Sequence, residues 1–421
     1  MLNWGKYGFK VRPVIPVEDY RHRLVNLQSE MEDYTSQIIE QARQARRYGR
    51  VYRQIWGSGK SVFLYNVADR LNSEMFLGHG LEGNGESKYD HILAIFYPQP
   101  VKENTLLESA LNAGFPQIGS SEAPRNWGLF LHVLSYVTLR RALLEGKTTD
   151  AKSLSGSLGD ISRCARVQES IERLGSKTRE KAIEVATSFL ERVLGPVRTK
   201  DRTIVTSNLP ILMNRIDTSE FNDAFNALLS SRNKALLNFE IFNTVCRESR
   251  IFLFMVFDQM EEYRGAHLSV LNKIVVDQQY RNIHACVVER SDISEMMARK
   301  LRESYETITR RLALRILPPL DPAGFQEMAA MYLDEFRNGS PIIGRKFPFR
   351  DDAIEYLRQR SQSNPRKFLS CINDILPKAL ALDLSEISEA DLKKPQMAAV
   401  IASALRAQEG LGSISGEMEP R

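Results

Sequence analysis

The sequence has few cysteines and histidines and no long apolar run. Its four cysteines lie far apart and form no CxxC pair, so we expect reduced thiols and neither disulfides nor a zinc site. The six histidines are equally scattered. No stretch reaches the roughly 18 apolar residues of a membrane span, and the first residues, MLNWGKYGFKVRPV, lack the apolar core of a signal peptide. We therefore expect a cytoplasmic protein that has no membrane partner.

The overall composition is that of an ordinary globular protein. The chain has 421 residues, of which 43% are hydrophobic and 26% are charged, and its net charge is +5. This charge is well below that of a dedicated nucleic-acid binder but is compatible with a local basic face. The candidate face is a run of five arginines: Arg43, Arg46, Arg47, Arg50 and Arg53. Such a run is also typical of a solvated helix surface, which would need no partner.

The spacing of apolar residues predicts an α/β protein with a parallel sheet. Five β-like runs are GRVYRQIW (49–56), HILAIFYP (91–98), RIFLFMVFD (250–258), NIHACVVER (282–290) and LALRILPPL (312–320). Helical stretches separate them, and three of the runs are apolar over most of their length. Both features are typical of strands covered by helices on each face.

These patterns divide the chain into four parts. We expect an extended arm that packs on the body and a helix at 21–48, and we place the boundary of this amino-terminal unit (1–44) within that helix. An α/β core follows over 45–320 and contains a helical insertion at about 100–245. A helical lid over 321–405 and a disordered tail over 406–421 complete the chain.

The stretch WGSGKS has a β-like run before it and a helical pattern after it, as a phosphate-binding loop requires. Gly57 and Gly59, with Ser58 between them, would let backbone N–H groups turn toward phosphates. Lys60 would contact the β- and γ-phosphates, and the Ser61 hydroxyl would bind Mg²⁺. The alternative is a flexible turn that carries a surface lysine.

The apolar run RIFLFMVFD ends in a carboxylate that suits a magnesium site. Asp258 would hold Mg²⁺ beside the loop, and either Glu261 or Glu262 could orient the attacking water as a general base. A buried strand that runs into an acidic, solvated turn is the alternative interpretation. The order of this run after WGSGKS favours the magnesium site.

Three arginines are further candidates. Arg366 follows a proline at the predicted start of a helix and could reach the γ-phosphate. Arg310 and Arg311 precede the last β-like run, from which an arginine could reach the active site of a neighbouring subunit and stabilise the transition state. Ordinary surface charge is the alternative for all three.

The order of phosphate loop, acidic strand, further strand and helical lid with Asn-Pro-Arg-Lys resembles the AAA+ superfamily of P-loop NTPases. The nearest likeness is to its origin-recognition and STAND-like branch, and IWGSGKSVFL looks like the loop of KAP-type NTPases. The likeness covers roughly residues 45–100 and 245–380.

The resemblance implies a sheet of order 5-1-4-3-2, a lid, ATP with Mg²⁺, and a homo-oligomer with active sites between subunits. It assigns Lys60 and Ser61 to the first motif, Asp258 to the metal, and Arg366 to nucleotide sensing in the lid. NIHACVVER would be a sensor strand, with Ser291 as the polar residue near its end.

The sequence departs from this family at two glutamines. Gln54 stands where the loop motif has its first glycine, and Gln259 stands where many AAA+ proteins place the catalytic glutamate. These departures bear on the rate of hydrolysis more than on binding. No winged helix is evident after the lid, so a DNA reader of the origin-recognition type is not predicted.

Three functions compete. The first is an ATPase that assembles and acts on DNA or on other protein components, as replication loaders, transposition regulators and phage-defence ATPases do. The second is a scaffold that binds ATP and hydrolyses it slowly or not at all. The third is a small-molecule kinase, which the distant acidic strand and the Asn-Pro-Arg lid disfavour.

Overall fold

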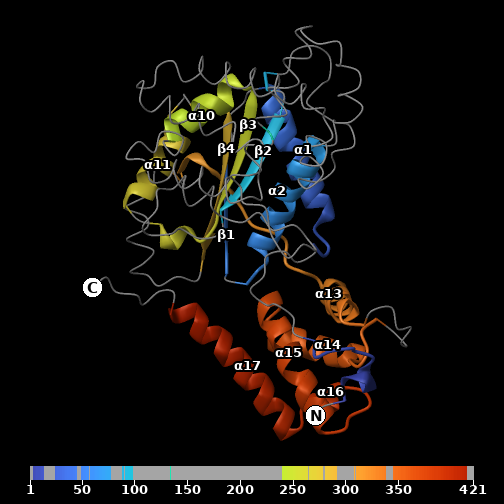
Figure 1. Cartoon of the computed structure of the whole chain (residues 1–421). Coiled ribbons are helices and arrows are strands. Elements are labelled where there is room, and N and C mark those ends of the chain that lie inside the picture. Colours follow the sequence, from blue (N-terminus) through green and yellow to red (C-terminus); the bar gives the residue numbers. More distant parts are fainter. Residues whose placement is uncertain are drawn as a thin grey trace, which may run out of the picture.

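A computed structural model describes two packed parts of the chain, an α/β core and a helical lid (Figure 1). The described residues are 3–13, 24–44, 49–55, 57–76, 88–89, 91–97, 133, 239–263, 265–277, 280–291, 308, 310–337 and 345–414. The helical insertion expected over 100–245 lies almost wholly outside them, as do Arg46 and Arg47 of the arginine run.

The core is a five-stranded sheet in which every pair of neighbouring strands is parallel. The strands are β1 (Arg50–Gln54), β2 (His91–Tyr97), β3 (Ile251–Phe257), β4 (Ile283–Arg290) and β5 (Ala313–Arg315). Their order is β2-β3-β4-β1-β5, which is the order 5-1-4-3-2 that the resemblance implied. The predicted α/β architecture with a parallel sheet is thus confirmed.

Helices cover both faces of the sheet, which explains why β2 and β3 are buried along their whole length. Helices α1 (Gln28–Gln44) and α2 (Lys60–Phe76) pack on one face, where their apolar side chains form one cluster with alternate residues of the strands. Helices α10 (Phe239–Glu248) and α11 (Gly265–Val276) lie on the other face (Figure 1).

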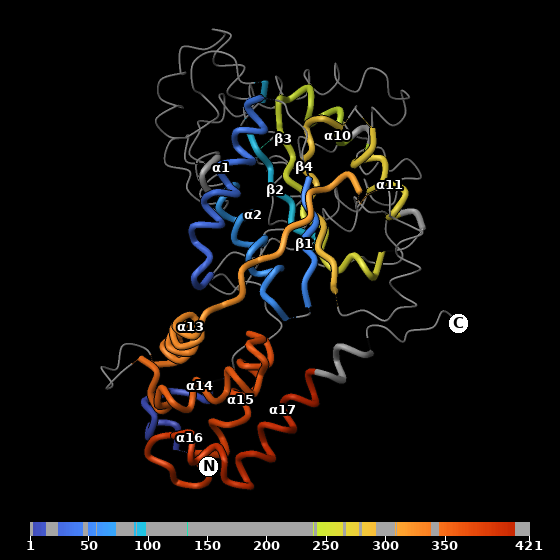
Figure 2. The backbone as a smooth tube through the Cα atoms, turned by 180° about the vertical axis from the view of Figure 1, so that it is seen from behind, coloured from blue at the N-terminus to red at the C-terminus, as the bar shows by residue number. Residues whose placement is uncertain are grey.

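Strand β5 is much shorter than predicted. Of the run 312–320, only Ala313–Arg315 pairs with β1, opposite Arg50–Tyr52, and the last two residues of β1 have no partner in β5. Beyond β5, Pro318 and Pro319 have no N–H group to donate to a sheet. The chain instead continues as an extended linker to the lid (Figure 2).

The lid consists of α13 (Pro322–Glu335), α14 (Asp351–Arg360), α15 (Pro365–Ala381), α16 (Glu389–Leu392) and α17 (Pro395–Ile414). Three of these helices begin where the sequence provides a capping side chain. The side chains of Asp321, Asn364 and Ser388 accept hydrogen bonds from the first turns of α13, α15 and α16. Residues 406–414, which we assigned to a disordered tail, continue α17, so that boundary was placed too early.

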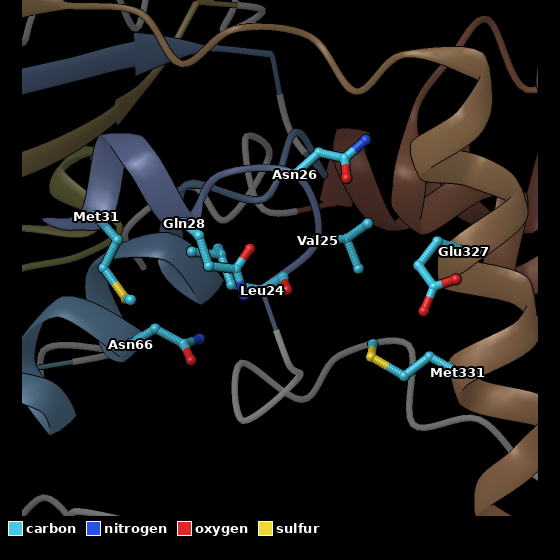
Figure 3. A pocket seen from close by; sticks show the side chains of 8 residues that line it. All are labelled: Leu24, Val25, Asn26, Gln28, Met31, Asn66, Glu327 and Met331. Carbon is cyan, nitrogen blue, oxygen red and sulfur yellow. Dashed lines mark hydrogen bonds between the residues drawn. The ribbon is translucent and has the colours of Figure 1, made fainter.

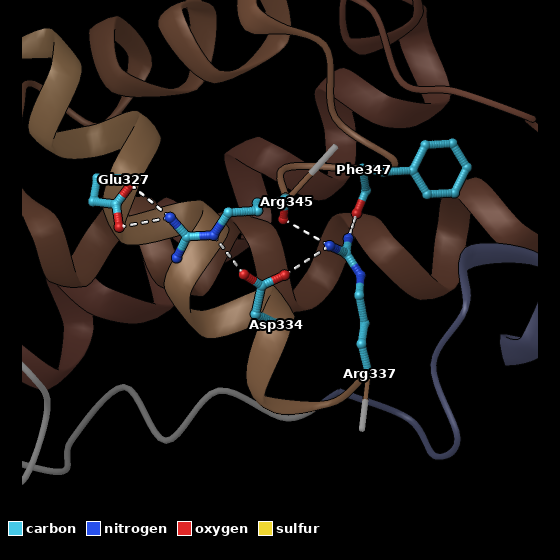
Figure 4. Close-up of polar contacts among 5 residues, drawn as sticks. All are labelled: Glu327, Asp334, Arg337, Arg345 and Phe347. Carbon is cyan, nitrogen blue, oxygen red and sulfur yellow. Dashed lines mark hydrogen bonds and ion pairs between the residues drawn. The ribbon is translucent and has the colours of Figure 1, made fainter. Parts of the chain in front are cut away.

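A buried arginine joins two segments of the lid (Figure 4). The guanidinium of Arg337 donates to the backbone carbonyl of Arg345 at 2.7 Å, to that of Phe347, and to Asp334 Oδ1 at 3.0 Å. Arg345 forms further ion pairs with Asp334 and Glu327, but its side chain is 58% exposed, whereas that of Arg337 is 5% exposed.

The amino-terminal arm packs on the lid. A short 3₁₀ helix, η1 (Trp4–Tyr7), places Tyr7 and Phe9 in the apolar core of the lid. The Tyr7 hydroxyl donates to the carbonyl of Leu384 at 2.9 Å, and Lys6 Nζ to that of Asp383 at 2.7 Å. We expected the arm on the body of the protein; its described residues 3–13 are instead an integral part of the lid (Figures 1 and 2).

The helix predicted at 21–48 starts later than expected. Residues 24–27 are not helical, and Asn26 has a positive φ of 53°, so α1 begins only at Gln28. Among the helices that the structure describes, none is long and apolar enough to cross a membrane.

Candidate functional site

The glycine loop lies between the carboxyl end of β1 and the amino end of α2, as the motif requires. Gly57 and Gly59 have φ values of 78° and 90°, in the left-handed region that favours glycine. The carbonyl of Gly59 accepts the Phe63 N–H at 2.9 Å, so it starts the hydrogen bonding of α2. Left-handed residues at a helix N-terminus turn backbone N–H groups toward one point, which is a geometry that binds anions.

The Lys60 side chain is folded back over this loop. It is buried, and its Nζ donates to the carbonyls of Gln54 and Ile55 at 2.9 Å each and to Ser58 Oγ at 3.3 Å. These hydrogen bonds hold the ammonium group beside the loop. The alternative of a flexible turn with a surface lysine does not fit this geometry.

Asp258 lies directly beside the loop. The Ser61 hydroxyl donates to its carboxylate, which also accepts the N–H of Gln259 at 2.8 Å. Burial raises the pKa of Asp258, while the hydrogen bond from Ser61 and the charge of Lys60 act in the opposite direction. The structure thus brings together the hydroxyl and the carboxylate that we predicted as magnesium ligands.

The two glutamates have different environments. Both lie in a short 3₁₀ helix, η2 (Met260–Glu262), which follows Gln259 in a left-handed conformation. Glu261 is 7% exposed, whereas Glu262 is half-buried. Burial raises the pKa of Glu261 from 4.5 to about 7, with a further contribution from Asp258. The charges of Arg290 and Lys60 partly oppose this shift of the pKa.

The end of β4 contributes a residue that sequence reasoning missed. Arg290 is paired in register with Gln54 of β1 and acts electrostatically on Glu261. Arg290 is the last residue of NIHACVVER, the predicted sensor strand, and a cation at this position was the feature of the sequence that could have indicated its role. Ser291 contacts the site through its backbone, because its N–H donates to the Gln54 carbonyl at 3.0 Å, while its side chain is exposed.

The lid touches the glycine loop through the start of α15. A Cβ atom added at Gly57 would lie 2.6 Å from Oδ1 of Asn364 and 2.8 Å from Cβ of Arg366. The Asn-Pro-Arg sequence of the lid and the loop are therefore in direct contact, and Arg366 is close to the position where the resemblance placed it.

Arg310 and Arg311 lie elsewhere. Both are exposed, and they precede β5, whose first residue is paired with Arg50 at the start of β1. The loop follows the other end of β1, about 13 Å further along a strand of this length. Within one chain, these arginines therefore lie at the opposite edge of the sheet from Lys60.

A pocket of about 390 Å³ lies between the core and the lid (Figure 3). Met31 of α1 and Asn66 of α2 line one side, and Glu327 and Met331 of α13 line the other. Leu24, Val25, Asn26 and Gln28 complete the lining. Asn66 is six residues after Lys60, so the pocket begins about 9 Å along α2 from the lysine. Sequence reasoning gave no indication of this pocket, since it is made by segments about 300 residues apart.

Three members of the arginine run have internal partners, and the first, Arg43, pairs with Glu40 on its own helix at 3.9 Å. The guanidinium of Arg50 lies 3.8 Å from the centre of the Tyr34 ring and donates to the Tyr52 hydroxyl at 3.1 Å. Arg53 forms an ion pair with the buried carboxylate of Glu289 on β4. Arg50 and Arg53 belong to β1, so the arginine run is not one continuous helix face.

The described part of the chain holds no cluster of three or more histidine, cysteine or acidic side chains that could bind a metal ion. A magnesium site would therefore depend on Ser61, Asp258 and phosphate oxygens. No protein-family model matches this chain, and no curated protein matches it either.

Proposed function

We propose that this protein is an AAA+-like ATPase that binds ATP with Mg²⁺, assembles into oligomers and acts as a nucleotide-dependent switch. The observation that carries the proposal is the Lys60 ammonium, held above a loop with two left-handed glycines and next to the Ser61–Asp258 pair. Each part of this arrangement suits a nucleoside triphosphate, whose phosphates need N–H groups, a cation and a metal.

Each residue around the loop would have a distinct role in binding ATP and Mg²⁺. Backbone N–H groups of residues 57–61 would bind the phosphates, and Lys60 would move from its two carbonyl partners to the β- and γ-phosphates. Ser61 and Asp258 would hold Mg²⁺, which neutralises phosphate charge when bound. Arg366 of the lid would contact the γ-phosphate from the other side of the loop.

The pocket between α1, α2 and α13 suits the nucleoside. Its volume falls in the range typical of small-molecule sites, and its distance of about 9 Å from Lys60 along α2 matches the reach of a nucleotide from phosphate to base. The two methionines would contact the base, and Asn66, Gln28 and Glu327 supply polar groups for it. A ligand that fills this pocket would touch both core and lid.

Glu261 is the better candidate for the general base. A carboxyl group with a pKa of about 7 is well suited to accept a proton from water at neutral pH. Its electrostatic interactions with Asp258 and Lys60 support a position near the phosphates that these residues would hold. Glu262 is the more exposed of the two and remains the alternative.

A non-hydrolysing scaffold is the second candidate. Gln259 takes the position after the acidic strand and adopts a left-handed conformation, so the two glutamates are displaced along η2. Steady-state ATP turnover of the wild type, Glu261→Gln and Glu262→Gln decides between the two functions. Turnover that one substitution abolishes would exclude the scaffold; ATP binding with no turnover in the wild type would exclude the ATPase.

Assembly is supported by the surface around β5. Leu314 and Ile316 are 50% and 67% exposed and lie two residues apart, and Arg310 and Arg311 precede them. A second copy that packed here would receive these arginines near its own loop. Mass photometry with and without ATP and DNA would detect the assembly.

We propose replication, transposition or phage defence as the pathway in which this protein acts. Replication, transposition and phage defence each combine such an ATPase with other protein components, and DNA is a candidate partner in all three. Because Arg50 and Arg53 have internal partners, DNA would have to bind other cations. Binding that weakens steeply as salt increases would support a DNA partner, and salt-insensitive or absent binding would remove it.

A further inference from the structure

Gln54 stands where the loop motif has a glycine, and the backbone there does not need one. Gln54 is the last residue of β1, is paired with Arg290 of β4, and has no positive φ, unlike Gly57 and Gly59. A side chain at this position therefore causes no strain in the turn, and it can make contacts that glycine could not.

Gln54 makes three contacts at once. Its carbonyl accepts hydrogen bonds from Lys60 Nζ at 2.9 Å and from the Ser291 N–H at 3.0 Å. Its side-chain amide donates to the carbonyl of Leu317 at 2.9 Å. One residue thus joins the lysine of the loop, the end of β4 and the linker that runs from β5 to the lid.

The linker after Leu317 can transmit a displacement of Leu317 to the lid. Leu317 is 3% exposed and belongs to the core between α1, α2 and the sheet. Pro318 and Pro319 come next, and two consecutive prolines make a stiff, extended segment. Asp321 then caps α13 and also accepts a hydrogen bond from Asn26 Nδ2 at 2.8 Å. A shift of the Leu317 carbonyl is therefore passed to the first helix of the lid.

We infer that Gln54 is a positioning residue that couples occupancy of the phosphate loop to the position of the lid. The inference rests on the proposed function, because the coupling starts when Lys60 leaves the Gln54 carbonyl for a phosphate. That step changes the hydrogen bonding of Gln54, whose amide holds Leu317. The contact of Gly57 with Asn364 and Arg366 is separate and lies on α15, so loss of the Gln54 amide leaves it in place.

The test compares the full-length wild type with Gln54→Ala and Gln54→Gly, the second of which restores the glycine of the motif. Gln359→Ala is the matched control, because it removes an exposed glutamine on α14 that bonds only within its own helix. Hydrogen exchange over 316–337 is measured without nucleotide, with ADP and with ATPγS, each with Mg²⁺. Nucleotide affinity is measured on the same samples.

We expect the wild type and Gln359→Ala to show a nucleotide-dependent change in exchange over 316–337. Both Gln54 variants should bind nucleotide within about threefold of the wild type and lose most of this change, with kcat altered more than KM. Variants that keep the full change would overturn the inference and leave the proposed function intact. A wild type that binds no nucleotide would overturn both.

Loss of folding is kept apart from loss of coupling by a third variant. Gln54→Asn retains the amide but is one methylene shorter, so it keeps the polarity of the site and cannot span the distance to Leu317. If Gln54→Ala unfolds, Gln54→Asn is expected to show the same loss of nucleotide-dependent exchange. A wild-type response in Gln54→Asn would contradict the inference.

Discussion

Replacing Gly57 and Gly59 with alanine, one at a time, separates backbone strain from contact with the lid. Both glycines have left-handed φ values, so alanine at either position costs about 1–2 kcal/mol in conformational energy. They differ in their surroundings. A Cβ at Gly59 would meet no atom within 4 Å, whereas a Cβ at Gly57 would lie 2.6 Å from Asn364 Oδ1 and 2.8 Å from Arg366 Cβ.

The additional cost at Gly57 follows from the second of these contacts. The Arg366 Cβ is fixed to the backbone of α15, so relieving the overlap requires the helix to move. Such overpacking costs about 1–3 kcal/mol. We therefore expect Gly57→Ala to lower the unfolding free energy by about 2–5 kcal/mol in total, against about 1–2 kcal/mol for Gly59→Ala.

Urea denaturation gives both free energies, and hydrogen exchange over 365–381 reports whether α15 has moved. Gly57→Ala should raise exchange at the start of α15, and Gly59→Ala should not. Equal destabilisation by the two substitutions, with no change at α15, would refute the contact between loop and lid.

Three further predictions concern buried ionisable side chains. If Glu261 is the base, kcat/KM should rise as the pH increases through about 7, the pKa of Glu261 in the protein without substrate. Glu261→Gln should remove this rise, whereas Glu262→Gln should keep it. A rise centred near pH 4 instead would contradict the assignment. Burial lowers the pKa of His284 from 6.5 to about 3, and the His284 ring is held between the Tyr34 hydroxyl at 2.9 Å and Gln41 Oε1 at 2.6 Å. Below pH 6.5 the unfolded chain binds a proton at His284 that the folded chain does not, so the unfolding free energy should fall as the pH drops toward 3. The urea midpoint of His284→Gln should fall less steeply with pH than that of the wild type. The same dependence of the midpoint on pH in both proteins would refute this prediction. Arg337→Met should destabilise the lid by about 2–5 kcal/mol, since two backbone carbonyls lose a buried donor, whereas the exposed Arg345→Met should cost less than about 1 kcal/mol; similar melting curves for the two would refute it.

Local patterns were enough to predict a parallel α/β sheet, whereas its strand order was implied by the family resemblance. WGSGKS and the run that ends at Asp258 specify a strand, a turn and an acidic residue within a few positions each, and parallel strands bring their carboxyl ends to one edge. The loop, Ser61 and Asp258 were therefore brought together as predicted, whereas the contact of Gly57 with Asn364 and Arg366 was not predicted.

The features that were missed depend on contacts between distant segments. Tyr7 bonds to Leu384, which is 377 residues away, and no periodicity in the arm reveals that partner. The pocket and the Gln54–Leu317 hydrogen bond likewise join the core to the lid or its linker. Strand β5 was predicted too long because its apolar pattern continues into the linker, where Leu317 is buried without pairing to β1.

The most direct test of the account is nucleotide binding by calorimetry, with ATP and Mg²⁺, in the wild type and in Lys60→Ala. Lys393→Ala, which removes an exposed lysine from the lid, is the matched control. The account predicts saturable binding by the wild type and the control, and a loss of at least about tenfold in affinity for Lys60→Ala. No binding by the wild type, or equal affinity for folded Lys60→Ala, would contradict a phosphate-binding role for this loop.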